Sequence, residues 1–252
     1  NYIIGVRIGA GKYYYSCQKN LEVKLYCALI YLIKQRSSFM KNKIKAVIFD
    51  MDGVLIEAKD WHYEALNRVL GLFGHNISRY DHLVTYDGLP TVVKLEMITL
   101  ERGLPKSLHE FINELKQKYT IELVHQHCKP RFYHEYALSQ LRVQGYRIGC
   151  GSNSVRQSIE IMLEKSDLMK YMEVVVSAQE VENPKPSPEM YNKIISSFGL
   201  NPEECLIVED NENGIKAAKA SGAHVLIVQE VGEVNIDNIE KKIKEINHGG
   251  EM

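Results

Sequence analysis

The chain has 252 residues, of which 45% are apolar and 25% charged, and its formal net charge is −1. A chain of this length can bury a core without disulfides or a structural metal, and it suits one α/β domain with a modest insertion. The balanced charge argues against nucleic acid or a membrane surface as a partner. Five scattered cysteines, with no Cys-x-x-Cys pair, fit a reducing compartment, so we expect a cytoplasmic protein.

Residues 1–39 are rich in tyrosine and have no clean periodicity, so we treat them as an unassigned N-terminal extension. Gly9, Gly11 and Lys12 suggest a phosphate-binding loop, but the spacing is wrong and Tyr13 replaces the required Ser or Thr. The most apolar stretch, residues 25–33, is too short to span a bilayer. Met40 precedes the first convincing strand and is interpreted as the natural start.

From residue 45 onward, short apolar runs alternate with longer segments of helical period, which predicts a parallel sheet flanked by helices. Both faces of such a sheet are covered, which explains why the runs are apolar without interruption. Strands are predicted at residues 46–49, 146–150, 174–177, 206–208 and 225–228. Helices are predicted at residues 155–164, 188–198 and 214–221, the last closed by Gly222.

A long interval separates the first two predicted strands, and it contains helical patterns only, at residues 61–73, 91–101, 108–125 and 132–143. We therefore predict an α/β fold: a doubly wound parallel sheet with an inserted all-helical cap domain. The predicted core domain comprises residues 40–57 and 144–235, and the cap comprises residues 58–143. Isoleucines at helical spacing predict a C-terminal helix or tail over residues 236–252.

Four polar groups stand at or just beyond the carboxyl ends of predicted strands, the edge where open α/β sheets bind ligands. Each has an ordinary explanation by itself, as a turn former, a helix cap or a solvated loop residue. Their occurrence together, in this order, favours a functional site. They are Asp50 and Asp52, Ser152 with Asn153, Lys185 between two prolines, and Glu209 with Asp210.

Carboxylates that converge on one point repel one another unless a hard divalent cation lies between them, and Mg²⁺ prefers oxygen ligands. A phosphate monoester is also anionic, so a carboxylate approaches phosphorus only when a cation neutralises that charge. Mg²⁺ and Lys185 would supply the neutralisation. Ser152 and the backbone N–H groups that follow it, with Asn153 beside them, would hold the phosphoryl oxygens. The pattern therefore predicts phosphoryl transfer from a small phosphorylated metabolite.

Four segments, Asp-Met-Asp-Gly-Val, Gly-Ser-Asn-Ser, Pro-Lys-Pro and Val-Glu-Asp-Asn-Glu-Asn-Gly, resemble the motifs of the haloacid dehalogenase superfamily. The resemblance covers about residues 45–228 and is closest to the helical-cap branch that includes β-phosphoglucomutase and phosphoglycolate phosphatase. It implies that Asp50 is the nucleophile and that Asp52 is the acid and base. It also implies that Asp210 binds Mg²⁺ with Glu209 close by, and that Asp50 and the backbone carbonyl of Asp52 complete the ligands.

The cap carries weaker signals. Similarity to β-phosphoglucomutase implies that His62 senses bound substrate and positions Asp52, with simple packing as the alternative. The arginine by which that enzyme grips a distal phosphate is missing, because residues 88–91 read Gly-Leu-Pro-Thr. Lys116 or Lys118 lies about where the family has a second phosphate-contacting lysine, but we interpret both as solvated helix charges.

The expected function is a Mg²⁺-dependent phosphatase for a small phosphorylated metabolite such as a sugar phosphate, with an aspartyl-phosphate intermediate. A β-phosphoglucomutase-like phosphomutase is one alternative, which His62 supports and the missing arginine opposes. A non-catalytic binding or regulatory module of the same fold is the other, and no motif has lost the chemical group that turnover needs. Carbon–halogen cleavage is not expected, since the dehalogenases of the superfamily lack the counterpart of Asp52 and do not use Mg²⁺.

Overall fold

The computed structural model describes residues 2–8, 11–17 and 43–248, in two compact units that divide after residue 42. In the first unit, β1 (Tyr2–Ile8) and β2 (Gly11–Cys17) pair as an antiparallel hairpin. Aromatic and β-branched residues, which favour strands, are frequent in both segments. Gly9, Met40 and the apolar stretch at 25–33 lie outside the described residues.

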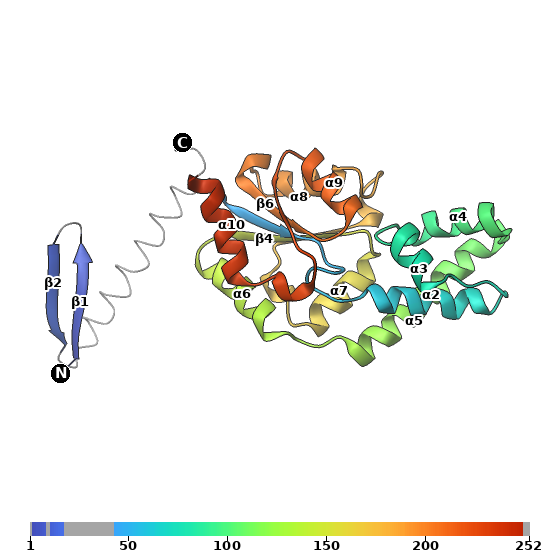
Figure 1. Cartoon of the computed structure of the whole chain (residues 1–252), viewed down its shortest axis with the longest axis horizontal. Coiled ribbons are helices and arrows are strands. Elements are labelled where there is room, and N and C mark those ends of the chain that lie inside the picture. Colours follow the sequence, from blue (N-terminus) through green and yellow to red (C-terminus); the bar gives the residue numbers. More distant parts are fainter. Residues whose placement is uncertain (1, 9–10, 18–42, 249–252) are drawn as a thin grey trace. The chain divides into compact units, whose positions relative to one another are not determined.

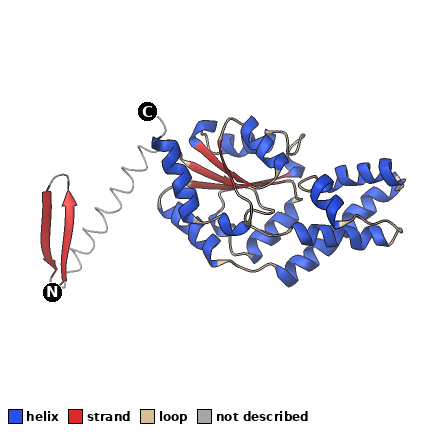
Figure 2. Ribbon diagram, in the orientation of Figure 1, coloured by secondary structure: helices blue, strands red, loops and turns tan. Residues whose placement is uncertain are grey.

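The second unit is built on a five-stranded parallel sheet in the order β5-β4-β3-β6-β7 (Figures 1 and 2). The chain winds outward from β3 to β5 and then returns to the other side of β3 for β6 and β7. The winding direction therefore reverses beside β3, which opens a crevice at the carboxyl ends of β3 and β6. The strands are β3 (Ala46–Phe49), β4 (Arg147–Ser152), β5 (Val174–Ser177), β6 (Cys205–Glu209) and β7 (His224–Ile227).

Helices cover both faces of this sheet, which confirms the predicted doubly wound class. Figure 1 shows α8 (Glu189–Ser197) and α9 (Glu212–Ala220) on one face. On the other face lie α6 (Phe132–Val143), α7 (Arg156–Lys165) and α10 (Ile236–His248). Short 3₁₀ segments complete the connections at Met169–Tyr171, Ala178–Glu180, Pro202–Glu204 and Val231–Glu233.

The core between the sheet and α8 requires close backbone approach. A Cβ at Gly149 of β4 would lie 2.8 Å from Ile194 Cγ2, so only glycine lets the helix pack this near. Ile48 and Ile207, from the two central strands, are fully buried in the same cluster. On the opposite face, α10 contacts α6, and Ile239 and Ile243 are buried, as the isoleucine spacing predicts.

Between β3 and β4 the chain forms the all-helical insertion that the sequence predicts. Its elements are α2 (Lys59–Gly71), α3 (Arg79–Asp81), a π-helical turn (His82–Tyr86), α4 (Thr91–Arg102), a 3₁₀ turn (Lys106–Leu108) and α5 (His109–His127). It has its own apolar core, which includes Leu70, Leu95 and Ile112. The domain boundaries stay a prediction. Because α6 contacts β4 and α10, we propose that the cap ends before α6 rather than at residue 143.

Candidate active site

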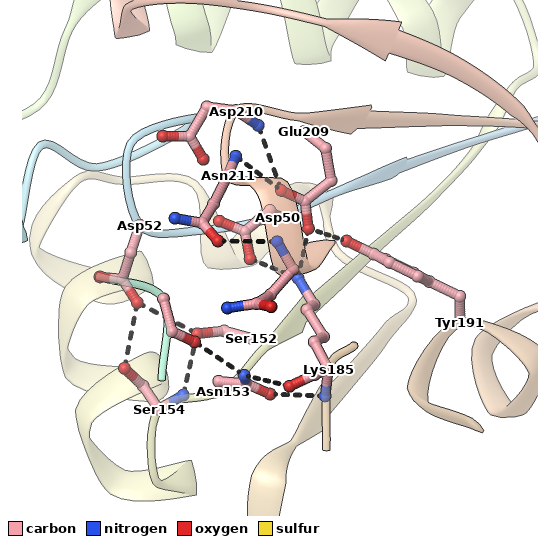
Figure 3. A network of polar contacts seen from close by, with 12 residues as sticks. Asp50, Asp52, Ser152, Asn153, Ser154, Lys185, Tyr191, Glu209, Asp210 and Asn211 are labelled. Atoms are coloured by element: carbon pink, nitrogen blue, oxygen red, sulfur yellow. Dashed lines mark hydrogen bonds and ion pairs between the residues drawn. The ribbon is translucent and has the colours of Figure 1, made fainter. Parts of the chain in front are cut away.

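The polar groups predicted from the strand ends gather at one edge of the sheet (Figure 3). Asp50 follows β3 directly, and its backbone N–H donates to the carbonyl of Val208 in β6 at 3.0 Å. Glu209 is the last residue of β6, and Asp210 follows it. Parallel neighbours end at the same edge, so β3 and β6 carry these three carboxylates to one place. Lys185 reaches the same place from the loop before α8.

Lys185 is the centre of a buried charge network. Its Nζ donates to Asp50 Oδ1 at 2.5 Å and to Glu209 Oε1 at 2.7 Å, and it lies 4.7 Å from the centre of the Tyr191 ring. Tyr191 Oη also donates to Glu209 Oε1. Burial alone would lower the pKa of Lys185, but the two carboxylates raise it above its usual range, so the ammonium stays charged.

The pKa of Asp50 is raised. Burial is the main cause, and the nearby charges of Glu209 and Asp210 add to it, while Lys185 opposes the change. Lys185 and Lys59 compensate only part of the negative charge that Asp50, Glu209 and Asp210 bring together. A divalent cation would compensate the remaining charge and favour the ionised, nucleophilic form of Asp50.

The residues at this edge fit a hard divalent cation. Oxygen atoms of Asp50, Glu209 and Asp210 lie within 4.8 Å of one another. The side chain of Asp210 is only 2% exposed. Its Oδ2 forms an ion pair with Lys59 Nζ at 2.8 Å, and its Oδ1 accepts no hydrogen bond from the described residues. At Gly53, where φ is +91°, a Cβ would lie 2.1 Å from Asp210 Oδ2. The unpaired Oδ1 and the space cleared at Gly53 suit Mg²⁺ ligation.

Asp52 is held apart from this acidic cluster. Its Oδ2 accepts hydrogen bonds from Ser152 Oγ at 3.2 Å and Ser154 Oγ at 3.0 Å, and its Oδ1 lies 3.1 Å from His62 Nε2. Burial alone would raise the pKa of Asp52, but His62 and the two serines together lower it to about 2. Two neighbouring aspartates therefore have opposite pKa shifts, an arrangement typical of sites that divide roles between carboxyl groups.

Asn153 joins three loops around the pocket. Its side-chain N–H₂ donates to the carbonyls of Gly88 at 3.0 Å and Lys185 at 3.2 Å, and its Oδ1 accepts from the Lys185 N–H at 3.1 Å. Gly88 belongs to the cap, so this amide links cap and core. The predicted phosphate contacts of Ser152 and Asn153 stay predictions. Ser154, which the sequence analysis does not single out, lines the pocket beside Asn153.

A pocket of about 430 Å³ lies between the sheet edge and the cap, a size that suits a small metabolite. Its core wall includes Asp50, Asp52, Lys185 and Glu209. Its cap wall includes His62, His82, Lys94 and Lys116. The core wall therefore carries three carboxylates and Lys185, whereas the cap wall carries these nitrogen groups, Lys59 and one carboxylate, Asp87.

Lys116 is the clearest error of the sequence analysis. It is 6% exposed, and its Nζ donates to His62 Nδ1 at 3.1 Å, so the interpretation as a solvated helix charge is wrong. The interpretation is right for Lys118, which is exposed two residues later. Helical spacing could have separated them, since Ile112, Lys116 and Thr120 recur every four residues on the buried face of α5.

Three comparisons place the chain among known proteins. A family model described as haloacid dehalogenase-like hydrolase matches residues 47–228. The phosphorylated carbohydrates phosphatase of Thermotoga maritima is 28% identical over 184 residues, 71% of this chain and 82% of that protein. Pyrophosphatase PpaX of Bacillus mycoides is 30% identical over 195 residues, 74% of this chain and 84% of that protein.

The same fold occurs in solved structures. The crystal structure of β-phosphoglucomutase from Clostridium difficile superposes with a TM-score of 0.71 at 22% identity, covering 80% of this chain and 98% of that one. Identity this low supports the fold rather than the activity. The family model, however, spans most of the chain and includes every predicted site residue. The chain belongs to the haloacid dehalogenase-like hydrolases.

Proposed function

We propose that this protein is a Mg²⁺-dependent phosphatase that hydrolyses a small phosphorylated metabolite, such as a sugar phosphate, through an aspartyl-phosphate on Asp50. The observation that carries the proposal is the division of the pocket floor into two carboxyl environments. Asp50 lies among Lys185, Glu209 and Asp210, while Asp52 lies among serines and His62. One carboxylate is thereby placed for attack and the other for proton transfer.

In the first step, an Asp50 oxygen attacks phosphorus, and the bond from phosphorus to the leaving oxygen breaks. Lys185, whose ammonium already touches Asp50, offsets the negative charge of the transferring group. Mg²⁺ bound by Asp50, Glu209 and Asp210 would supply further neutralisation of the phosphoryl oxygens. The Ser152 hydroxyl and the N–H groups after it would hold the remaining oxygen atoms.

Asp52 then manages the protons. A phosphate dianion beside Asp52 would raise the pKa of its carboxyl group from about 2, because a like charge disfavours ionisation. Asp52 can then protonate the leaving oxygen, and the carboxylate that remains can deprotonate the water that hydrolyses the aspartyl-phosphate. His62 would hold Asp52 in place, since Lys116 donates to its Nδ1 and its Nε2 faces Asp52.

Phosphate release tests the proposal. The purified protein should hydrolyse members of a panel of phosphomonoesters with Mg²⁺ present, and lose that activity on chelation. Asp50→Asn should reduce kcat by roughly 10³-fold or more, as loss of a nucleophile does. Asp237→Asn is the matched control, because Asp237 is exposed on α10, and its activity should equal that of the wild type.

Activity that survives both chelation and Asp50→Asn would contradict the proposal. Binding of phosphate with no release from any ester would instead favour the non-catalytic module. A phosphomutase is the second candidate, which the contact of His62 with both Asp52 and Lys116 favours. Conversion of β-glucose 1-phosphate to glucose 6-phosphate, primed by the bisphosphate and faster than phosphate release, would decide for the mutase.

A further inference from the structure

The buried tyrosine Tyr191 lies beside the acidic cluster, and the proposed mechanism gives it no role. It belongs to α8, is fully buried, and forms part of the core between this helix and the sheet. Packing in that core requires only its ring. Its hydroxyl group, however, points towards the carboxylates, as Figure 3 shows. A buried tyrosine hydroxyl group needs a hydrogen-bond partner, so the identity of the partner is informative.

The partner is the same carboxylate oxygen that holds Lys185. Tyr191 Oη donates to Glu209 Oε1, and Lys185 Nζ donates to this atom at 2.7 Å. The Tyr191 ring also faces the ammonium, with its centre 4.7 Å from Nζ. The face of an aromatic ring attracts a cation, because its electrostatic potential is negative. One side chain therefore contacts both members of the ion pair between Lys185 and Glu209.

The other contacts of Glu209 leave its carboxylate little freedom. Its Oε2 accepts from the backbone N–H groups of Asp210 at 3.1 Å and Asn211 at 3.4 Å. A Cβ at Gly214 would lie 1.8 Å from Oε1, so the carboxylate lies directly against the backbone of α9. Backbone groups thus fix one oxygen. Among the described residues, the other oxygen accepts only from the lysine and the tyrosine named above.

Lys185 is attracted by two carboxylates at once. Its Nζ donates to Asp50 Oδ1 at 2.5 Å as well as to Glu209. In the proposed reaction, its ammonium must also offset the charge of the transferred phosphoryl group beside Asp50. A strong attraction to Glu209 would draw the ammonium away from that group. The balance between the two carboxylates therefore affects the reaction, and the Tyr191 hydroxyl group acts on one side of it.

We propose that Tyr191 is a positioning residue for phosphoryl transfer, which acts on Lys185 through Glu209. Its hydroxyl group shares the negative charge of Glu209 Oε1, so this carboxylate competes less for the ammonium. More of the ammonium charge then remains for Asp50 and the phosphoryl oxygens. The inference rests on the proposed function, because it assumes that phosphate reacts at Asp50. Tyr191 is not among the described residues that line the pocket, so it acts only through these neighbours.

Tyr191→Phe tests this role, because it removes the hydroxyl oxygen and keeps the ring. With p-nitrophenyl phosphate and Mg²⁺, we expect kcat to fall about tenfold while KM stays nearly unchanged, an effect of roughly 1.4 kcal/mol. Mg²⁺ should bind the substrate-free variant more tightly, by about two- to fivefold, since Glu209 loses a donor and keeps its charge. Calorimetric titration measures this affinity without any turnover.

Tyr86→Phe is the matched control. Tyr86 is 1% exposed in the core of the cap, and its Oη donates to Glu101 Oε2 at 2.8 Å. The control therefore loses the same atom and the same kind of hydrogen bond, but away from the acidic cluster. Its kcat and Mg²⁺ affinity should equal those of the wild type. Urea unfolding should show that both variants are folded and lose similar amounts of unfolding free energy.

A merely structural tyrosine would give a different pattern. If loss of the hydroxyl group only loosened the site, kcat and Mg²⁺ affinity would fall together, and that result would overturn the positioning role. Unchanged kcat in Tyr191→Phe, or an equal fall in Tyr86→Phe, would overturn it as well.

The outcomes also separate this inference from the proposed function. Wild-type hydrolysis of p-nitrophenyl phosphate that Tyr191→Phe leaves intact overturns the positioning role alone. Failure of the wild type to release phosphate from any phosphomonoester in the presence of Mg²⁺ overturns the proposed function and this inference with it.

Discussion

The two walls of the pocket satisfy their charges in different ways. On the core wall, Lys185 contacts Asp50 and Glu209 directly, so cation and carboxylates compensate one another before any ligand binds. On the cap wall, Lys94 has no carboxylate within contact distance among the described residues. Side chains whose charges are already paired are held in place and can position reacting groups, whereas an unpaired charge is stabilised most when a ligand of opposite charge binds. We therefore propose that the core wall carries the chemistry and the cap wall the selectivity.

Removing the proposed proton-transfer group should have the largest effect. Asp52→Asn should slow hydrolysis of alkyl phosphates by roughly 10²–10⁴-fold. With p-nitrophenyl phosphate, whose leaving group needs no proton, the variant should release one equivalent of nitrophenol quickly and then stall, because water is no longer deprotonated. Rapid-quench kinetics measures this burst. Slow release without a burst would show that Asp52→Asn also impairs the first step with this substrate, so that the two steps are not affected separately.

Removing the buried lysine should lower stability on the core wall but not on the cap wall. Lys185→Met leaves Asp50 and Glu209 buried without their cation, so the metal-free protein should lose about 3 kcal/mol of unfolding free energy. Lys94→Met removes an uncompensated buried charge, so stability should stay equal or rise. Urea unfolding measures both, with exposed Lys241→Met as control. Equal losses in the two variants would refute the contrast between the walls.

The third prediction concerns acid stability and compares a core histidine with the cap. Burial lowers the pKa of His134 to about 4, from 6.5 in the unfolded chain, and the same holds for His82. Between pH 6.5 and pH 4 these histidines take up protons in the unfolded chain but not in the folded one. Their contribution to the free energy of unfolding is therefore fully present above about pH 6.5 and is lost as the pH falls towards 4. His134 should account for about 2 kcal/mol of the loss between pH 7 and 4.5.

Unfolding at both pH values tests this with His134→Gln, whose amide can still reach the Val231 carbonyl that His134 bonds at 2.9 Å. The variant should lose less stability on acidification than the wild type does. His125→Gln, at an exposed position on α5, should lose as much as the wild type. An equal loss of unfolding free energy on acidification in all three proteins would show that the pKa of His134 is not lowered by folding.

The smallest effect is expected where a cap residue reaches into the core wall. Lys59 begins α2, and its ammonium lies 2.8 Å from Asp210 Oδ2, where a divalent cation would also bind. Removing this competing charge with Lys59→Met should tighten Mg²⁺ binding a few-fold in the absence of substrate, since like charges repel. Calorimetric titration measures it, with Lys216→Met on α9 as control. Weaker binding would mean that Lys59 supports the metal site.

The core wall could be predicted from sequence because strand ends carry it. Asp50, Glu209 and Asp210 follow uninterrupted apolar runs, and parallel strands must bring such positions to one edge. The strand boundaries lie within two residues of those predicted, and the inserted helices follow from their periodicity. Tyr191 could not be found this way, because its contact with Glu209 depends on how α8 packs on the sheet.

Of the cap wall, only His62 was predicted, and the rest was missed for a physical reason. Its residues come from separate helices whose relative angles depend on tertiary packing, and each looks like an ordinary surface charge in the sequence. Lys94 lies in the first turn of α4, which gives no sign that its side chain is buried. His82 lies in a π-helical turn, and a five-residue turn leaves no periodic pattern. The cap residues that line the pocket could therefore be identified only from the three-dimensional structure.

The central claim is that Asp50 becomes phosphorylated beside a bound cation. Trifluoroberyllate mimics an aspartyl-phosphate, and ¹⁹F NMR detects its bound fluorines directly. We predict protein-bound fluorine resonances for the wild type with Mg²⁺, and none for Asp50→Asn under the same conditions. Resonances that persist in Asp50→Asn, or that form in the wild type equally well without Mg²⁺, would contradict the claim.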